Sequence, residues 1–202
     1  MTIAEAVPRM KAEERRELIL EAATAVFGES GYVGTTTDRV AKAAGVSQPY
    51  VVRMFGTKEQ LFLEVLQRAL ARLLAEFRAV LAAGTDDLQD RLALAYVELL
   101  RDRGLLLSLM HGFVLGADPV IGPAARHGFL DVYRFLREEA GFGPEDAQRF
   151  LEGGMMLNTL VGLRMSDDFD DDPWANELLC VTVPQKLDVL LGLGAAQRAE
   201  QR

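Results

Sequence analysis

A glycine between two short runs of helix-forming residues constrains this chain more than any other feature. It lies in residues 35–59, which read TTTDRVAKAAGVSQPYVVRMFGTKE. Val40, Ala41 and Ala44 follow a run of threonines at helical spacing, and threonine hydroxyls can cap the start of a helix. Gly45 is expected to end that helix, because glycine enters the left-handed conformation without a steric penalty at Cβ. The segment therefore predicts a short helix that ends in a tight turn.

A second short helix is expected directly after the turn, over about residues 48–54. Ser47 is placed to cap it, and Pro49 falls in its first turn, where the missing N–H of proline costs nothing. Val51 and Phe55 are four residues apart and should face the core. Two helices joined in this way form a unit that can place a short helix in the major groove of DNA.

The polar residues of the second helix are left for its outer face. Gln48 and Arg53 can make bidentate contacts to base edges, and Tyr50 can reach a phosphate or a thymine methyl group. Lys58 opens the next helix, where the helix dipole and an ammonium group favour a phosphate. Each residue taken alone is typical of a solvated surface. The capping residues, the glycine in the turn and the lysine at the start of the next helix together favour an interface with DNA.

The N-terminal third of the chain resembles the tetracycline-repressor-like (TetR) family of bacterial transcription regulators. The resemblance runs over about residues 15–66 and is carried by LILEAATAVFGESGY, TTTDRVAKAAGVS and FGTKEQLF. It implies that the first helix supports the turn, the second binds the DNA backbone and the third reads bases. The contacts that it implies are to phosphate from Thr36, Thr37 and Lys58, and to the groove from Gln48, Pro49, Tyr50 and Arg53.

The chain departs from the family pattern at one position. The family usually has an aromatic residue, typically a phosphate-contacting tyrosine, three residues before its conserved phenylalanine. Here that position is Val52, and an aromatic residue stands two positions earlier, at Tyr50. Whether Tyr50 replaces the usual tyrosine stays open at this point.

The composition favours a helical protein and excludes several other classes. Half of the 202 residues are apolar, and the abundance of Ala, Leu, Glu and Arg is typical of helices. No uncharged apolar run reaches the ~18 residues that span a bilayer, and the N-terminus lacks the apolar core of a secretion signal. Cys180 is the only cysteine, which excludes a disulfide framework. We therefore expect a cytoplasmic protein that does not contact a membrane.

Motifs typical of catalysis or of metal binding are missing from the sequence. There is no Gly-rich phosphate loop, no G-x-S-x-G and no Cys/His pair at nucleophile spacing. His111 and His127 lack the pairing of a helical metal site. The acidic residues 166–172 lack the glycine and distal glutamate of an EF-hand loop, so they are interpreted as a solvated loop. We expect no enzymatic activity, no metal and no cofactor.

The charge of the chain is divided unevenly along its length. The net charge is −8, yet residues 1–59 carry eight basic and eight acidic side chains and are neutral. The acidic excess therefore lies entirely in residues 60–202. Phosphate contacts supply much of the affinity for DNA. We therefore expect this neutral N-terminal segment, the reading unit, to bind DNA tightly only when two copies act together.

Helical periodicity continues through the rest of the chain, and no alternating strand pattern, internal repeat or long linker interrupts it. Besides the helix that Gly45 ends, the expected helices cover about residues 12–30, 48–54, 58–84, 87–101, 104–115, 119–140, 144–165 and 173–193. The fold class is therefore all-α, with about nine helices. We expect a helix-turn-helix DNA-binding domain over residues 1–58, and a larger helical domain for ligand binding and dimerisation over residues 59–202.

The last two expected helices carry the apolar stripes best suited to a dimer contact. A dimer would hold two reading helices about 34–36 Å apart on a palindromic operator in double-stranded DNA. TetR proteins dimerise through their last two long helices, which agrees with this choice. The expected interface residues are Leu151, Met155, Thr159, Gly162, Leu179, Val183, Leu187 and Leu190. The alternative is that both stripes fill the core of a single subunit.

A cavity for an apolar small molecule is an implication of the resemblance alone. The residues that would line it are Phe77, Tyr96, Met110, Phe113, Phe129, Tyr133, Met156 and Asn158. The chain is accordingly interpreted as a DNA-binding transcriptional repressor that acts as a homodimer and is released from its operator by such a ligand. A helical scaffold protein without sequence-specific DNA binding is the alternative, and base selectivity that is insensitive to Arg53 would favour it.

Overall fold

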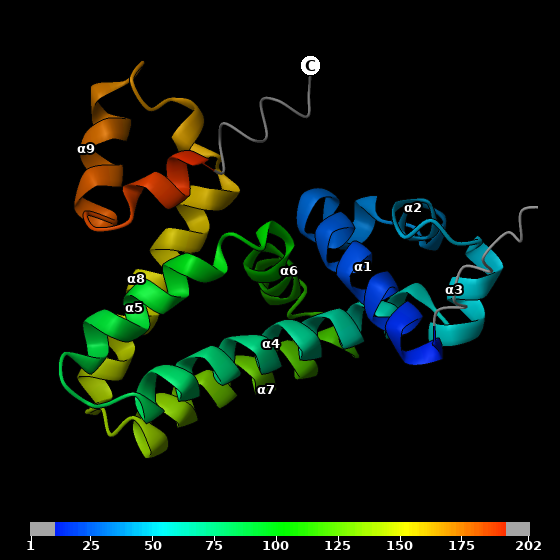
Figure 1. Cartoon of the computed structure of the whole chain (residues 1–202), viewed down its shortest axis with the longest axis horizontal. Coiled ribbons are helices and arrows are strands. Elements are labelled where there is room, and N and C mark those ends of the chain that lie inside the picture. The colour runs from blue at the N-terminus through cyan, green and yellow to red at the C-terminus, as the bar shows by residue number, and fades with distance from the viewer. Residues whose placement is uncertain (1–10, 193–202) are drawn as a thin grey trace, which may run out of the picture.

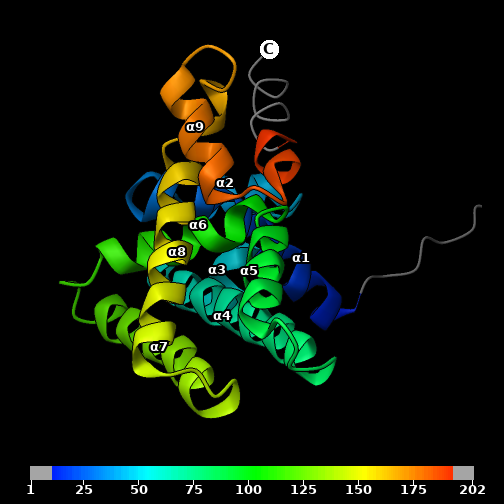
Figure 2. The same ribbon diagram turned by 90° about the vertical axis from the view of Figure 1, so that its left-hand side faces the viewer.

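The computed structural model describes residues 11–192, and every regular element in this range is helical (Figures 1 and 2). The all-α expectation is thereby confirmed. The elements are α1 (Ala12–Gly34), α2 (Thr37–Ala43), α3 (Gln48–Phe55), α4 (Lys58–Ala82), α5 (Leu88–Leu99), α6 (Arg103–Val114), α7 (Ile121–Arg134), a π-helical turn (Phe135–Glu139), α8 (Pro144–Gly162), a 3₁₀ turn (Met165–Asp167) and α9 (Pro173–Thr182).

Two hydrophobic cores lie along the molecule, and α4 takes part in both. The first core packs α1, α2 and α3 around the start of α4, with Phe27, Val51 and Phe62 fully buried. The second core packs the rest of α4 against α5 to α9, with Phe77 and Phe135 at its centre. Figure 1 shows α4 extending from the α1–α3 group toward the far end of the molecule, with α7 lying along it. A displacement of α4 therefore changes the packing of both cores.

Helix α6 joins the two cores by a second route. Gly104, near its start, packs against the backbone of α1 at Gly28, where neither residue has a Cβ to hold the helices apart. Toward the other end, the ring of His111 lies against Gly31, and its Nε2 is 3.3 Å from the carbonyl oxygen of Gly28. Glycine at these positions allows α6 to lie directly on the backbone of α1.

The predicted boundaries of the first and last helices needed correction. The first helix was expected to end near residue 30, where Gly31 does adopt a left-handed φ of +66°, but one further helical turn carries α1 to Gly34. The last helix was expected to reach residue 193, and this prediction was wrong within the described residues. It ends at Thr182, because Pro184 lacks an N–H and disfavours helical geometry at Val183. A separate helical segment covers residues 187–192.

The long helix expected over residues 119–140 also differs from the prediction. It begins at Ile121, where the carboxylate of Asp118 accepts hydrogen bonds from the N–H groups of Val120 and Ile121. These bonds hold the pKa of Asp118 below its ordinary value. At Phe135 the α-helix gives way to a π-helical turn that ends before Gly141, a glycine with φ +74°. The acidic residues after α8 do form a short turn and loop, and Asp172 caps the start of α9.

Candidate nucleic-acid interface and ligand cavity

The turn between α2 and α3 is built by local hydrogen bonds. Thr36 caps α2, and its hydroxyl accepts a hydrogen bond of 3.2 Å from the N–H of Arg39. Gly45 adopts φ +64°, and the N–H of Val46 then bonds back to the carbonyl oxygen of Ala41 at 3.0 Å. This is the arrangement by which a left-handed residue satisfies the free carbonyl groups at a helix end. The turn fixes the direction in which α3 leaves α2.

Two of the residues beside this turn have roles that differ from those expected. Thr35 is fully buried, and its hydroxyl donates to the carbonyl oxygen of Gly31 at 2.8 Å instead of capping α2. Ser47 occupies the N-cap position of α3 but makes no capping hydrogen bond through its side chain. Thr35 thus ties the kink in α1 to the start of the turn.

One face of α3 is anchored in the core and the other is open to solvent. Val51 and Phe55 are buried, whereas Gln48, Pro49 and Arg53 are exposed. The amide nitrogen of Gln48 donates to the hydroxyl of Thr37 at 3.2 Å, which connects the starts of α2 and α3. The exposed groups include the two side-chain types that read base edges with paired hydrogen bonds.

Tyr50 is half-buried between two guanidinium groups. The Cζ atom of Arg53 lies 5.0 Å from the centroid of the tyrosine ring, and that of Arg15 lies 5.5 Å from it. Both distances are within the range of a cation–π contact. Arg15 comes from α1 and was not among the predicted site residues. No local pattern could have revealed it, because the contact joins positions 35 residues apart in the sequence.

Lys58 lies in the first turn of α4 and is held by Tyr32. Its Nζ atom donates to the carbonyl oxygen of Tyr32 at 3.0 Å and lies 4.3 Å from the centroid of that ring. Thr57 caps the helix, and the side chain of Gln60 completes a capping box with it. An ammonium group has three donors, so the group in Lys58 can bond to an anion while keeping its contact with Tyr32.

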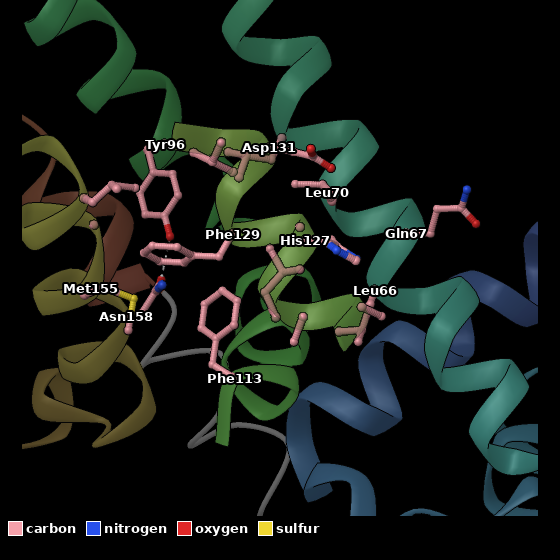
Figure 3. Close-up of a pocket in the computed structure, with 18 of the residues that line it drawn as sticks. Leu66, Gln67, Leu70, Tyr96, Phe113, His127, Phe129, Asp131, Met155 and Asn158 are labelled. Atoms are coloured by element: carbon pink, nitrogen blue, oxygen red, sulfur yellow. Dashed lines mark hydrogen bonds between the residues drawn. The ribbon is translucent and has the colours of Figure 1, made fainter. Parts of the chain in front are cut away.

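A cavity of about 370 Å³ lies between α4, α5, α6, α7 and α8 (Figure 3). Most of its wall is apolar, as is typical of pockets for small organic ligands. Five of the eight residues predicted to line a pocket do line this cavity: Phe77, Tyr96, Phe113, Phe129 and Asn158.

The other three predicted pocket residues, Met110, Tyr133 and Met156, lie outside the lining. Met156 projects from the outer side of α8 and is 46% exposed, because consecutive residues of a helix point in directions about 100° apart. Its neighbour Met155 faces the cavity, as does Leu151. Both of these residues were predicted as dimer contacts, and both are lining residues within one subunit.

The polar groups of the lining gather at opposite sides of the cavity. On one side the hydroxyl of Tyr96 donates to the Oδ1 atom of Asn158 at 3.0 Å, and burial raises the pKa of this tyrosine to about 12. On the other side lie Gln67, His127 and Asp131, as Figure 3 shows. The carboxylate of Asp131 pairs with the guanidinium of Arg134 outside the lining.

The other residues predicted for the dimer contact occupy two kinds of position. Thr159 and Gly162 are exposed on α8. Leu179, Val183 and Leu190 are buried within the subunit, and Leu187 is half-buried against the same core. Large apolar side chains that do face solvent are Met156 on α8, Leu163 directly after it, and Trp174 and Val181 on α9. No helix within residues 11–192 has the length and apolar character needed to cross a membrane.

The fold and the site together define a class of protein: a helix-turn-helix head on a helical body that encloses an apolar cavity. Comparison with known proteins identifies the family within this class. The family model described as bacterial regulatory proteins, tetR family, matches residues 19–65. The HTH-type transcriptional regulator BetI of Rhizobium meliloti is 30% identical over 158 residues, which cover 75% of this chain and 78% of BetI. The chain belongs to the TetR family of transcriptional regulators.

Two further comparisons show how much of the sequence and of the fold this chain shares with known regulators. The HTH-type transcriptional activator FasR of Mycolicibacterium smegmatis is 40% identical over 81 residues, which cover 40% of this chain and 37% of FasR. A TetR-like transcriptional regulator from Rhodococcus sp. RHA1 has the same fold, with a TM-score of 0.60 at 18% identity over 95% of this chain and 99% of that structure. These relatives are regulators of transcription, and the fold extends over both helical cores.

Proposed function

We propose that this chain is a homodimeric transcriptional repressor that leaves its operator when an apolar small molecule fills the cavity. Residues 1–58 would form the DNA-binding domain, and residues 59–202 the ligand-binding and dimerisation domain. The observation that carries the proposal is the exposed polar face of α3, anchored in one core, together with the cavity in the other core. Helix α4 belongs to both cores. Since the proposed partner is DNA, we expect the protein to act in the cytoplasm.

In this proposal Gln48 and Arg53 read base edges from α3. Both side chains are exposed and can form the paired hydrogen bonds that distinguish bases in the major groove. Thr36 and Thr37 at the start of α2, and Lys58 at the start of α4, would contact phosphates. Pro49 and Tyr50 would lie in the groove beside them.

Two observations support dimerisation: the charge of the chain and the exposed surface of its last helices. The neutral N-terminal 59 residues offer little net attraction to DNA, so two reading units on one palindromic operator would be needed for tight and selective binding. Trp174 and Val181 on α9 are 75% and 70% exposed, and Leu163 follows the end of α8. Apolar surface of this kind supports contact with a second copy through α8 and α9.

Release from DNA would require a ligand that binds the two states of the dimer with unequal affinity. Leu66, Leu70 and Leu73 place one side of α4 along the cavity wall, and the helix continues back to Lys58 at the interface. Helix α6 provides a second connection, because Phe113 lines the cavity while Gly104 rests on α1. A ligand that changes the position of α4 or α6 would change the distance between the two α3 helices of the proposed dimer.

Gel-shift titrations with DNA from beside the coding region of this protein would test the proposal. We expect Gln48→Ala and Arg53→Ala each to reduce discrimination between operator and unrelated DNA by about 1–3 kcal/mol. Lys58→Ala should weaken binding to all sequences alike. Arg78→Ala, exposed near the C-terminal end of α4, is the matched control and should change neither property. Base selectivity that survives both α3 substitutions would instead support the scaffold hypothesis.

A further inference from the structure

The charges around the cavity restrict the ligand more than its apolar wall does. None of the described residues that line it is a lysine or an arginine, and the one acidic side chain is Asp131. His127, the one histidine of the described lining, is exposed, so an anionic group deep in the cavity would lose its hydration without gaining an opposite charge, which costs several kcal/mol in real proteins. Carboxylates and phosphates are consequently disfavoured as the buried part of the ligand.

The Tyr96–Asn158 pair presents a hydrogen-bond donor to the cavity. Asn158 is only 3% exposed, and its Oδ1 atom accepts the hydrogen bond from Tyr96. Its amide nitrogen has no hydrogen-bond partner among the described residues. Every fully buried side-chain nitrogen or oxygen in the described part of the chain does have a partner. The amide nitrogen must therefore be accessible from the cavity that Asn158 lines.

The availability of a donor does not depend on which way the amide is turned. With Oδ1 toward Tyr96, the NH₂ group of Asn158 is free to donate into the cavity. With the amide rotated by 180°, NH₂ donates to the tyrosine oxygen, and the hydroxyl of Tyr96 becomes the free donor. In both arrangements one N–H or O–H group faces the cavity and needs an acceptor.

Resting on the proposed ligand-controlled function, we propose that the cavity takes an uncharged, largely apolar molecule whose carbonyl, ester or amide oxygen bonds to the Tyr96–Asn158 pair. Four aromatic side chains on the wall suit a flat or aromatic body: Phe77, Phe113, Phe129 and Phe150. A volume of about 370 Å³ lies within the range of ~300–1,000 Å³ that is typical of sites for small organic ligands. Gln67 and His127 lie at the opposite side, where polar parts of the ligand reach solvent.

Three probes of matched size test this ligand class on the full-length protein without DNA. They are 4-phenylbutan-2-one, which carries a neutral acceptor, 4-phenylbutanoate, which carries a charge, and butylbenzene, which carries neither. Affinities are measured by calorimetry at pH 7.5. We expect the ketone to bind at least about tenfold more tightly than the carboxylate, because the carboxylate must be buried without a partner. Equal or tighter binding of the carboxylate would overturn the proposal, as would failure of the ketone to bind.

Substitutions at the polar pair test the hydrogen bond itself. The double variant Tyr96→Phe, Asn158→Leu removes both possible donors. It should weaken binding of the ketone about 3- to 10-fold, the value of one hydrogen bond, and leave butylbenzene unaffected. Because both partners of the buried hydrogen bond are replaced together, no polar group is left without a partner and the variant should fold. Gln148→Leu removes an exposed amide from the same helix and should change neither affinity. An equal reduction in affinity for the ketone and butylbenzene in the double variant would overturn the assignment, as would an unchanged affinity for the ketone.

A second measurement, operator binding in the presence of each probe, separates binding of the ligand from release of DNA. If the ketone binds as expected but leaves the protein–operator complex intact, the ligand class stands and the proposed mechanism of release fails. If the carboxylate binds more tightly and releases the operator, the proposed function stands and the ligand class is wrong.

Discussion

Gly28 of α1 and Gly104 of α6 touch backbone to backbone. A Cβ on Gly28 would lie 2.5 Å from the Cα of Gly104, and a Cβ on Gly104 would lie 2.3 Å from the carbonyl oxygen of Thr24. Both distances are shorter than real Cβ contacts, and the atoms they meet belong to the backbone, which cannot rotate away. This close approach holds α1, which supports the proposed DNA-binding helices, against α6, which lines the cavity.

Gly28→Ala or Gly104→Ala should therefore force α1 and α6 apart. Such overpacking typically costs about 1–3 kcal/mol of unfolding free energy, which chemical denaturation would measure. Gly153→Ala is the control, because no atom lies within 4 Å of the added Cβ in the middle of α8. That variant should gain up to about 1 kcal/mol from helix propensity. Equal behaviour of the three variants would show that the two backbones are not tightly packed in solution.

The ring of Tyr50 is expected to position two guanidinium groups for DNA. Tyr50→Phe keeps the aromatic face and should bind the operator within a factor of about two of wild type, since the cation–π interactions remain. Tyr50→Leu removes that face, and it should weaken operator binding by about 0.5–1 kcal/mol for each of the two arginines that the ring no longer holds. Gel shifts on one operator compare the two variants. A phenylalanine variant as weak as the leucine variant would point to the hydroxyl, and hence to a direct hydrogen bond between Tyr50 and DNA.

Arg15→Ala tests whether the arginine from α1 reaches a phosphate. If it does, the slope of log affinity against log salt concentration should become shallower by about one. Arg137→Ala is the control, because its guanidinium bonds to the carbonyl oxygen of Phe142, in the core distant from α3. An unchanged slope for Arg15→Ala would leave Arg15 as a support for the ring of Tyr50 only.

Local signals in the sequence were sufficient to predict the helix-turn-helix region. Gly45 and the start of α3 at Gln48 follow from turn and capping chemistry, which acts between residues a few positions apart. Pro184 carried an equally local signal, but the apolar periodicity on both sides of it favoured one continuous helix. The physical reason for the break is the proline itself, so this error could have been avoided from the sequence.

The remaining differences depend on tertiary packing. Met155 and Met156 are both apolar and adjacent, yet one faces the cavity and the other faces solvent, which only the rotation of α8 against α5 and α6 decides. Leu179 lies on an apolar stripe that fills the core, as the alternative interpretation of the stripes allowed. The pairing of Arg15 with Tyr50 likewise joins segments that come together only in the folded chain.

The pKa of Tyr96 predicts how stability depends on alkaline pH. Burial raises it from 10.0 to about 12, although the hydrogen bond with Asn158 opposes the shift. The folded protein therefore holds the proton more tightly than the unfolded chain, and this contribution is present in full below pH 10. It is lost as the pH rises from 10 through 12, and it amounts to roughly 2–3 kcal/mol. Denaturation between pH 9 and 12 should show a steeper decline in stability for wild type than for Tyr96→Phe, and parallel curves would contradict the burial of this hydroxyl.

The exposed apolar residues of α9 provide the last prediction, which concerns assembly. If α8 and α9 meet a second copy, Val181→Arg would bury an unpaired charge in the interface and should weaken the dimer by at least about 2 kcal/mol. Val114→Arg is the control, since Val114 is 76% exposed at the end of α6 and belongs to neither α8 nor α9. Sedimentation over a range of protein concentrations would compare the two variants. Dissociation of the dimer in Val114→Arg alone would move the interface to α6, and a lasting dimer in both variants would exclude the exposed side of α9 from the interface.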